Sequence, residues 1–167
     1  MATESKKCQI KIGKGRLFGL ITALFTFVIL FCNWFKIDAS FMGSFSFSIF
    51  HKDMFDLNTC LGLAKVFAII ALVVGILYII NFAINFEKFV PGLKKFKFGF
   101  NRLFGLVYYG FYTLALLFNI IGCIAEESVV PTVRVIFIFI LMILIVLAYA
   151  IPAISKFANK KFELVIE

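Results

Sequence analysis

Four long apolar segments occupy most of the chain, and they constrain its fold more than any other feature. They cover about residues 17–35, 62–86, 103–125 and 129–154. A helix needs roughly 20 mostly apolar residues to cross a bilayer, so each segment is long enough to span. The chain is 63% hydrophobic, whereas soluble domains contain roughly 45–50% apolar residues. We therefore predict an all-α membrane protein in which residues 1–167 form a single four-transmembrane-helix bundle.

The first apolar segment follows a basic leader, as the apolar core of a secretory signal peptide would. However, it is longer than a usual signal-peptide core, and no cleavage site with two small residues follows it. The residues that do follow, Cys32 to Phe35, indicate an anchor at the membrane interface. We expect this segment to be retained as a transmembrane helix.

Lysine and arginine are distributed unevenly between the two ends of these segments. The N-terminal tail, the loop of residues 87–102 and the C-terminal tail hold thirteen of the seventeen basic residues. Basic residues concentrate in short cytoplasmic loops, so we predict that this loop and both termini are cytoplasmic and that the protein lies in the plasma (cytoplasmic) membrane. The net charge of +8 favours contact with anionic membrane lipids. Because the basic residues adjoin the spans, we do not expect nucleic acid to be a partner.

The largest outer loop, residues 36–59, has the pattern of a β-hairpin. Apolar and polar residues alternate on both sides of Met42 and Gly43, and a period of two places alternate residues on one face of a strand. Two such runs around a glycine-containing turn predict an extracellular hairpin between the first two helices. One interpretation is that the apolar face of this hairpin packs on the outer helix ends as a cap. The other is that the hairpin has a free edge that binds a partner strand. Its apolar residues include Phe41, Phe45, Phe47 and Ile49.

Two cysteines, Cys32 and Cys60, flank this hairpin, where a disulfide would tie its ends together. Free buried thiols are the alternative. His51 lies in the same loop close to Asp53 and Asp56, but the spacing matches no closed metal site. We predict no metal and no cofactor.

Small residues recur on one face of the second span at spacings of four, three and four. Such a stripe lets helices approach closely in lipid. It is consistent with packing inside the bundle and also with self-association. The stripe consists of Ala64, Ala68, Ala71 and Gly75.

All five tyrosines map to the predicted cytoplasmic half of their helices. One interpretation is an aromatic belt at the inner membrane surface. The other is a polar, aromatic pocket that is open to the inner leaflet and suited to a lipid. Residues expected to line that pocket are Tyr78, Asn81, Tyr112 and Tyr149.

The sequence gives little support to catalysis or to coupled transport. The single histidine lies in the outer loop, and no carboxylate pair lies near a candidate nucleophile. Proton- and ion-coupled carriers usually place charged residues at mid-membrane. Here Lys65 is near enough to the outer surface to reach it, and Asn119 is more typical of helix–helix hydrogen bonding. We predict no catalytic residues and no enzyme activity.

The topology resembles that of the claudin and peripheral-myelin tetraspan proteins, with four spans, both ends inside and a first outer loop that contains strands. Trp34 is similar to the claudin loop tryptophan, whereas the Gly-Leu-Trp run and the paired loop cysteines of claudins are missing, and only Cys60 remains. The chain also resembles small uncharacterised four-span proteins of low-GC Gram-positive bacteria. Trp34-Phe35, the Ser-Phe-Ser run of residues 44–48 and Phe55-Asp56 carry this second likeness. A likeness of this kind implies a fold and transfers no activity.

These features together predict a non-enzymatic multi-pass membrane protein that acts as a scaffold or accessory subunit. Its expected partners are membrane lipids and other membrane-protein subunits or copies of itself. A small oligomeric channel or permease component is the first alternative. A lipid-handling protein that uses the inner tyrosines is the second.

Overall fold

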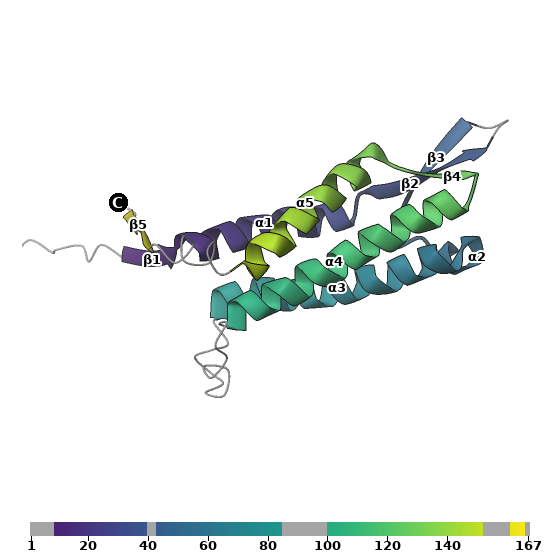
Figure 1. Cartoon of the computed structure of the whole chain (residues 1–167). Coiled ribbons are helices and arrows are strands. Elements are labelled where there is room, and N and C mark those ends of the chain that lie inside the picture. Colours follow the sequence, from purple (N-terminus) through teal and green to yellow (C-terminus); the bar gives the residue numbers. More distant parts are fainter. Residues whose placement is uncertain (1–8, 40–42, 85–99, 152–160, 166–167) are drawn as a thin grey trace, which may run out of the picture.

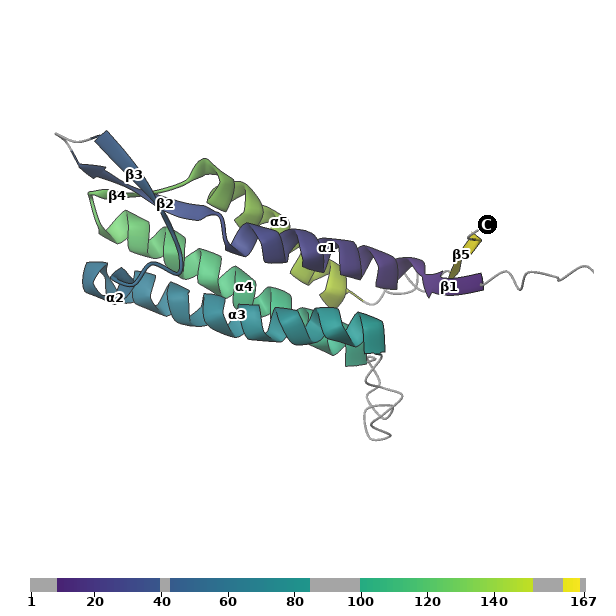
Figure 2. The ribbon, with the colours of Figure 1, turned by 180° about the vertical axis from the view of Figure 1, so that it is seen from behind.

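The computed structural model describes residues 9–39, 43–84, 100–151 and 161–165. These residues form four long helices along one common axis and one short helix, with strands at both ends of the bundle (Figure 1). The helices are α1 (Lys14–Leu30), α2 (Met54–Leu57), α3 (Thr59–Ile84), α4 (Phe100–Ala125) and α5 (Val133–Ala150). Helices α3 and α4 lie side by side in both views, with α1 packed mainly against α3 and α5 packed mainly against α4 (Figures 1 and 2).

Three of these helices are long and apolar enough to cross a membrane, over Thr59–Phe82, Arg102–Ala125 and Val133–Ala150. They support a membrane protein and agree with three of the four predicted segments. The apolar part of α1 is shorter, covering Leu17–Leu30. At about 1.5 Å per residue it is about 21 Å long, less than the roughly 30 Å hydrocarbon core. A fourth span therefore stays a prediction.

Two predicted spans extend too far because their outer ends form strands. The first was expected to continue to residue 35, but α1 ends at Leu30 and strand β2 begins at Asn33. The fourth was expected to begin at residue 129, but Val129–Pro131 forms strand β4, and α5 begins at Val133. Apolar residues suit a buried strand as well as a helix, so hydropathy alone does not separate the two in short segments.

The predicted hairpin is confirmed. Strands β2 (Asn33–Ala39) and β3 (Gly43–Ser48) pair antiparallel, with Ile37 opposite Phe45. Gly43 has a φ of 83°, a left-handed conformation that glycine adopts without steric cost, and this allows the chain to turn into β3. The third strand, β4, pairs antiparallel with the other edge of β2, which gives the order β3-β2-β4. The sequence pattern did not predict this third strand.

A second small sheet joins the two ends of the chain. Strands β1 (Gln9–Gly13) and β5 (Lys161–Val165) pair antiparallel, with Gln9 opposite Val165. This ribbon lies at the opposite end of the bundle from the three-stranded sheet (Figure 1). Both terminal strands therefore lie at one end, which we call the ribbon end, and the three-stranded sheet lies at the sheet end. The predicted basic loop of residues 87–102 lies mostly outside the described residues, which resume at Phe100.

Candidate functional site

The sheet is attached to the bundle by two large buried side chains of β2. Trp34 is 1% exposed and packs against Tyr112 of α4, with ring centroids 5.8 Å apart. Its indole Nε1 donates to the backbone oxygen of Ile29, 3.4 Å away. Phe35, also buried, stacks on Phe47 of β3 at 5.7 Å. The prediction that Trp34 and Phe35 form an interfacial anchor is therefore wrong, because both side chains point into the protein.

Polar contacts fix β2 to the connection between α4 and α5. The Thr132 hydroxyl lies 3.2 Å from the backbone oxygens of both Asn33 and Trp34 and donates to them. The Thr132 N–H donates to the Trp34 oxygen at 3.0 Å, and the Asp38 N–H donates to the Ser128 oxygen at the same distance. These bonds join segments almost one hundred residues apart in the chain. The sheet is therefore held in place by both halves of the protein.

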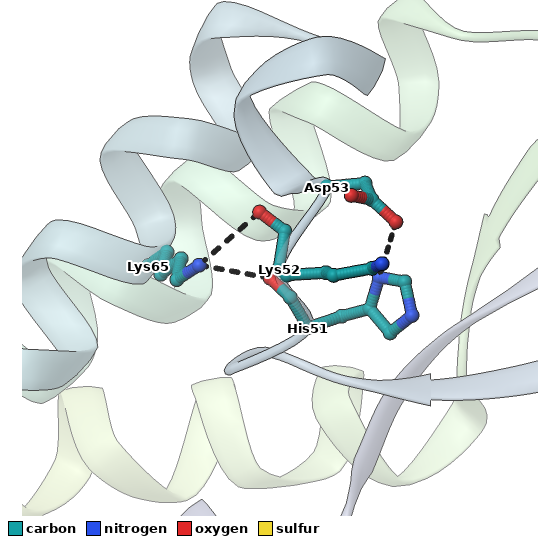
Figure 3. Close-up of polar contacts among 4 residues, drawn as sticks. All are labelled: His51, Lys52, Asp53 and Lys65. Atoms are coloured by element: carbon teal, nitrogen blue, oxygen red, sulfur yellow. Dashed lines mark hydrogen bonds and ion pairs between the residues drawn. The ribbon is translucent and has the colours of Figure 1, made fainter.

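A lysine of α3 forms hydrogen bonds to the turn after β3 (Figure 3). Lys65 Nζ donates to the backbone oxygen of His51 at 2.9 Å and to that of Lys52 at 3.4 Å. Beside it, His51 Nδ1 lies 3.7 Å from Asp53 Oδ2, an ion pair when the histidine is protonated. Both side chains of this pair are partly exposed, so the pair contributes at most about 1 kcal/mol to stability. Lys65 thus reaches the end of the helix and stabilises the loop.

The predicted apolar face of the hairpin divides between the core and the surface. Ile49 is fully buried, and Phe47 is half-buried between Phe35 and His51. Phe45, in contrast, is 49% exposed. Phe41 lies outside the described residues. The hairpin both caps the helix ends and displays an exposed strand, so the two interpretations of this face are compatible.

Strand β3 is an edge strand. It pairs with β2 on one side, and within the described part of the chain no strand pairs with its other side. Its residues Gly43 to Ser46 are exposed. An edge strand presents unpaired N–H and C=O groups that can pair with another chain.

The structure contains no bond between Cys32 and Cys60. Both are free and partly buried, and Cys123 is free and buried. Cys32 lines a crevice between α1 and α5, whereas Cys60 lies in the first turn of α3, where its N–H bonds to Asn58 Oδ1 at 2.7 Å. Of the two alternatives, the structure therefore has the free thiols and not the disulfide.

The small-residue stripe of α3 lies inside the chain. Ala64, Ala68 and Ala71 are fully buried, and Gly75 is buried as well. A Cβ atom added at Gly75 would lie 2.6 Å from Cε2 of Tyr108 in α4. In the structure, therefore, these residues pack within one chain, with no space at Gly75 for a larger side chain.

The tyrosines form a cluster in the interior of the bundle. Tyr78, Tyr108, Tyr109 and Tyr112 are at most 1% exposed. The belt interpretation is therefore wrong, since these rings face helices and not lipid. Tyr108 and Tyr109 are both buried although they are adjacent, because α4 has neighbours on several sides: α3 contacts Tyr108 near Gly75, and α1 contacts both hydroxyls.

Hydroxyl pairs link the helices at this cluster. The hydroxyl oxygens of Tyr108 and Thr26 lie 2.9 Å apart, and those of Tyr109 and Thr22 lie 2.8 Å apart. Each threonine also donates to a backbone oxygen of its own helix, so its single proton is used there and the tyrosine is the donor in each pair. These bonds fasten α1 to α4.

The residues predicted for an inner pocket pack into the interior of the bundle, three of them fully or almost fully buried. The hydroxyl oxygens of Tyr78 and Tyr149 lie 2.9 Å apart and join α3 to α5. Asn81, one helical turn beyond Tyr78, is fully buried. Tyr112 packs against Trp34 and is linked to Tyr78 through Tyr108, whose ring centroid lies 6.2 Å from that of Tyr112 and 5.9 Å from that of Tyr78. Sequence reasoning missed Arg102, which donates to the backbone oxygens of Tyr149 and Ala150 and so caps the C-terminal end of α5.

Three buried polar atoms in α4 have no hydrogen-bond partner among the described residues. They are Tyr112 Oη and both side-chain polar atoms of Asn119. A buried polar group without a partner costs about 1–3 kcal/mol. The expected role of Asn119 in helix–helix hydrogen bonding is not seen within the described part of the chain.

The described residues also contain no group of three or more histidine, cysteine or acidic side chains that could hold a metal ion. No family model, no curated protein and no solved structure matches this chain. Its function has to be argued from the geometry above.

Proposed function

We propose that this chain is a non-enzymatic integral membrane protein that acts as a scaffold or accessory subunit. In this proposal its helices cross the plasma membrane four times, with the ribbon end in the cytoplasm and the sheet outside. The sheet binds another membrane protein or a second copy of the chain. The resemblance to claudin and peripheral-myelin topology is part of the same proposal.

One observation carries it: an exposed edge strand on a sheet that is fixed to the bundle. The buried Trp34, the Thr132 bonds and the Lys65 contacts restrict the movement of the sheet. A partner strand that adds to β3 would therefore meet a preformed edge and would not have to order it. Main-chain hydrogen bonds along such an edge supply affinity, and side-chain pockets supply specificity.

The packed interior favours a scaffold function and argues against a pore that runs through a single chain. Where the four long helices meet, buried tyrosine rings contact one another, as in the pairs Tyr78–Tyr108 and Tyr108–Tyr109, with centroids 5.9 and 4.8 Å apart. Rings in contact at these positions occupy space that a pore through one chain would need.

Site-specific crosslinking in intact membranes tests the proposal. A photoreactive residue replaces Ser46 on the exposed edge of β3, and the matched control carries it at Lys52, which is exposed but lies in the turn. We expect a discrete adduct of defined mass from position 46 only. The Phe45→Lys substitution, which places a charge on the edge, should abolish it.

Two results would contradict the proposal. One is an equal adduct pattern from positions 46 and 52. The other is an adduct that persists in the Phe45→Lys variant while native mass spectrometry in mild detergent shows only monomer.

A further inference from the structure

A crevice of about 450 Å³ lies between α1 and α5 near the sheet end. This volume falls within the roughly 300–1,000 Å³ of sites that bind small ligands. Its walls are almost entirely apolar, and Phe25 and Leu141 on opposite walls are exposed, so the crevice opens onto the outside of the helices. It is lined by Phe25, Ile29 and Trp34 on one side and by Val135, Ile138 and Leu141 on the other.

The crevice runs along the helices over a depth that suits one lipid leaflet. On α5 its lining extends from Arg134 to Leu141, seven residues apart, which corresponds to about 10 Å at 1.5 Å per residue. Half of the hydrocarbon core of a bilayer is about 15 Å thick. The lining is therefore about two thirds as long as the hydrocarbon of one leaflet is thick.

The end of the crevice nearest the sheet is cationic. Arg134 is exposed and lies in the first turn of α5, where the peptide dipoles add positive potential. Among the residues that the structure describes, it forms no ion pair with a carboxylate. Exposed Asn33 lines the same end and offers a further polar group. An arginine of this kind is suited to phosphate, which its planar guanidinium can bind through two hydrogen bonds.

We propose that this crevice binds one acyl chain of an anionic phospholipid from the leaflet at the sheet end, with the lipid phosphate at Arg134. The occupant has to carry an anionic group directly above a hydrocarbon chain, and a phospholipid has both in this order. A helix of a partner protein fits less well, because a helix with its side chains is about 10–12 Å wide and needs a longer groove. The site is independent of the β3 edge and of the partner proposed above.

The full-length chain in nanodiscs of phosphatidylglycerol and phosphatidylcholine provides the test. Native mass spectrometry after release should show one retained phospholipid per chain, enriched in phosphatidylglycerol. Phosphatidylglycerol with a photoactivatable acyl chain should then form adducts within residues 25–34 and 134–141, and not along the exposed face of α3.

Matched variants distinguish the binding of the lipid's acyl chain from the binding of its headgroup. Leu141→Trp and Ile29→Trp fill the crevice from opposite walls, and either should abolish lipid retention. Ile140→Trp, on the exposed side of α5, should retain the lipid. Arg134→Gln should lower the preference for phosphatidylglycerol about tenfold, the order of one charge-assisted hydrogen bond. Lys36→Gln, another exposed cation of the sheet end, should not.

Several results would overturn the proposal. These are release of the wild-type chain without lipid, retention that survives both tryptophan substitutions in the crevice, or adducts spread evenly over the lipid-facing helices. Interchain crosslinks at residues 25–34 and 134–141 without a lipid adduct would show that a protein covers the crevice, and they too would refute it.

Discussion

Replacing Gly75 by alanine tests how closely α3 packs on α4. The added Cβ would lie 2.6 Å from Cε2 of Tyr108 and 3.2 Å from two further ring atoms. The ring has little freedom to retreat, because it is fully buried, its hydroxyl is bonded to Thr26, and its centroid lies 4.8 Å from that of the Tyr109 ring. Either Tyr108 or the whole of α3 has to move.

The size of the effect follows from two opposing contributions. Overpacking a well-packed core costs about 1–3 kcal/mol. Replacing glycine by alanine inside a helix stabilises the helix by about 1 kcal/mol, because alanine has the higher helix propensity. Gly110 of α4 provides the matched control, since a Cβ added there has no atom within 4 Å. The propensity gain is the same at both positions, so Gly75→Ala should be about 1–3 kcal/mol less stable than Gly110→Ala.

Thermal unfolding in mild detergent, followed through the fluorescence of the buried Trp34, measures this difference. For a chain of this size each kcal/mol shifts Tm by about 2–4 °C, so Tm of the two variants should differ by about 2–12 °C. Equal Tm values would refute the close packing of Gly75 on Tyr108. If Gly75→Ala instead changed the oligomeric mass at unchanged Tm, the stripe would serve self-association.

Two further predictions have opposite signs because one polar side chain is satisfied and the other is not. Thr26→Val and Tyr108→Phe should each lower the free energy of unfolding. A double-mutant cycle should give a coupling energy of about 0.6 kcal/mol and at most about 1.7 kcal/mol. Independent effects of the two substitutions would show that the hydroxyls do not interact. Asn119→Leu removes two buried polar atoms without partners among the described residues. We therefore expect the free energy of unfolding to rise by about 1–3 kcal/mol, with a higher Tm. A lower Tm would reveal a hydrogen bond to Asn119.

The sequence predicted the features that depend on neighbouring residues. The β2–β3 hairpin was identified because its alternation and its glycine turn are local signals. The three long apolar helices were found in the same way, since hydropathy over about 20 residues is a property of one segment.

Features that depend on distant residues were missed. Strand β4 has only three residues, Val129–Pro131, and these suit a helix start as well as a strand. Its assignment depends on β2, almost one hundred positions earlier. The tyrosines were placed at a membrane surface for the same reason: the sequence gives the depth of a residue along its helix but not the number of helices packed around it. Tyr108 and Tyr109 are both interior because α4 has neighbours on more than one side.

The early end of α1 and strand β4 are linked through the backbone hydrogen bonds of β2. Where hydropathy would continue the helix to Phe35, the chain leaves the helix after Leu30 and enters β2. Non-helical backbone next to hydrocarbon is tolerated only where the protein satisfies its polar groups. Strand β3 bonds to one side of β2, and β4 covers the other side at Phe35 to Ile37, directly above the helix ends. Without β4, this part of β2 would leave unpaired N–H and C=O groups beside buried Trp34 and Phe35. Three residues between α4 and α5 therefore allow a strand to occupy a place where the composition of the chain favours a helix.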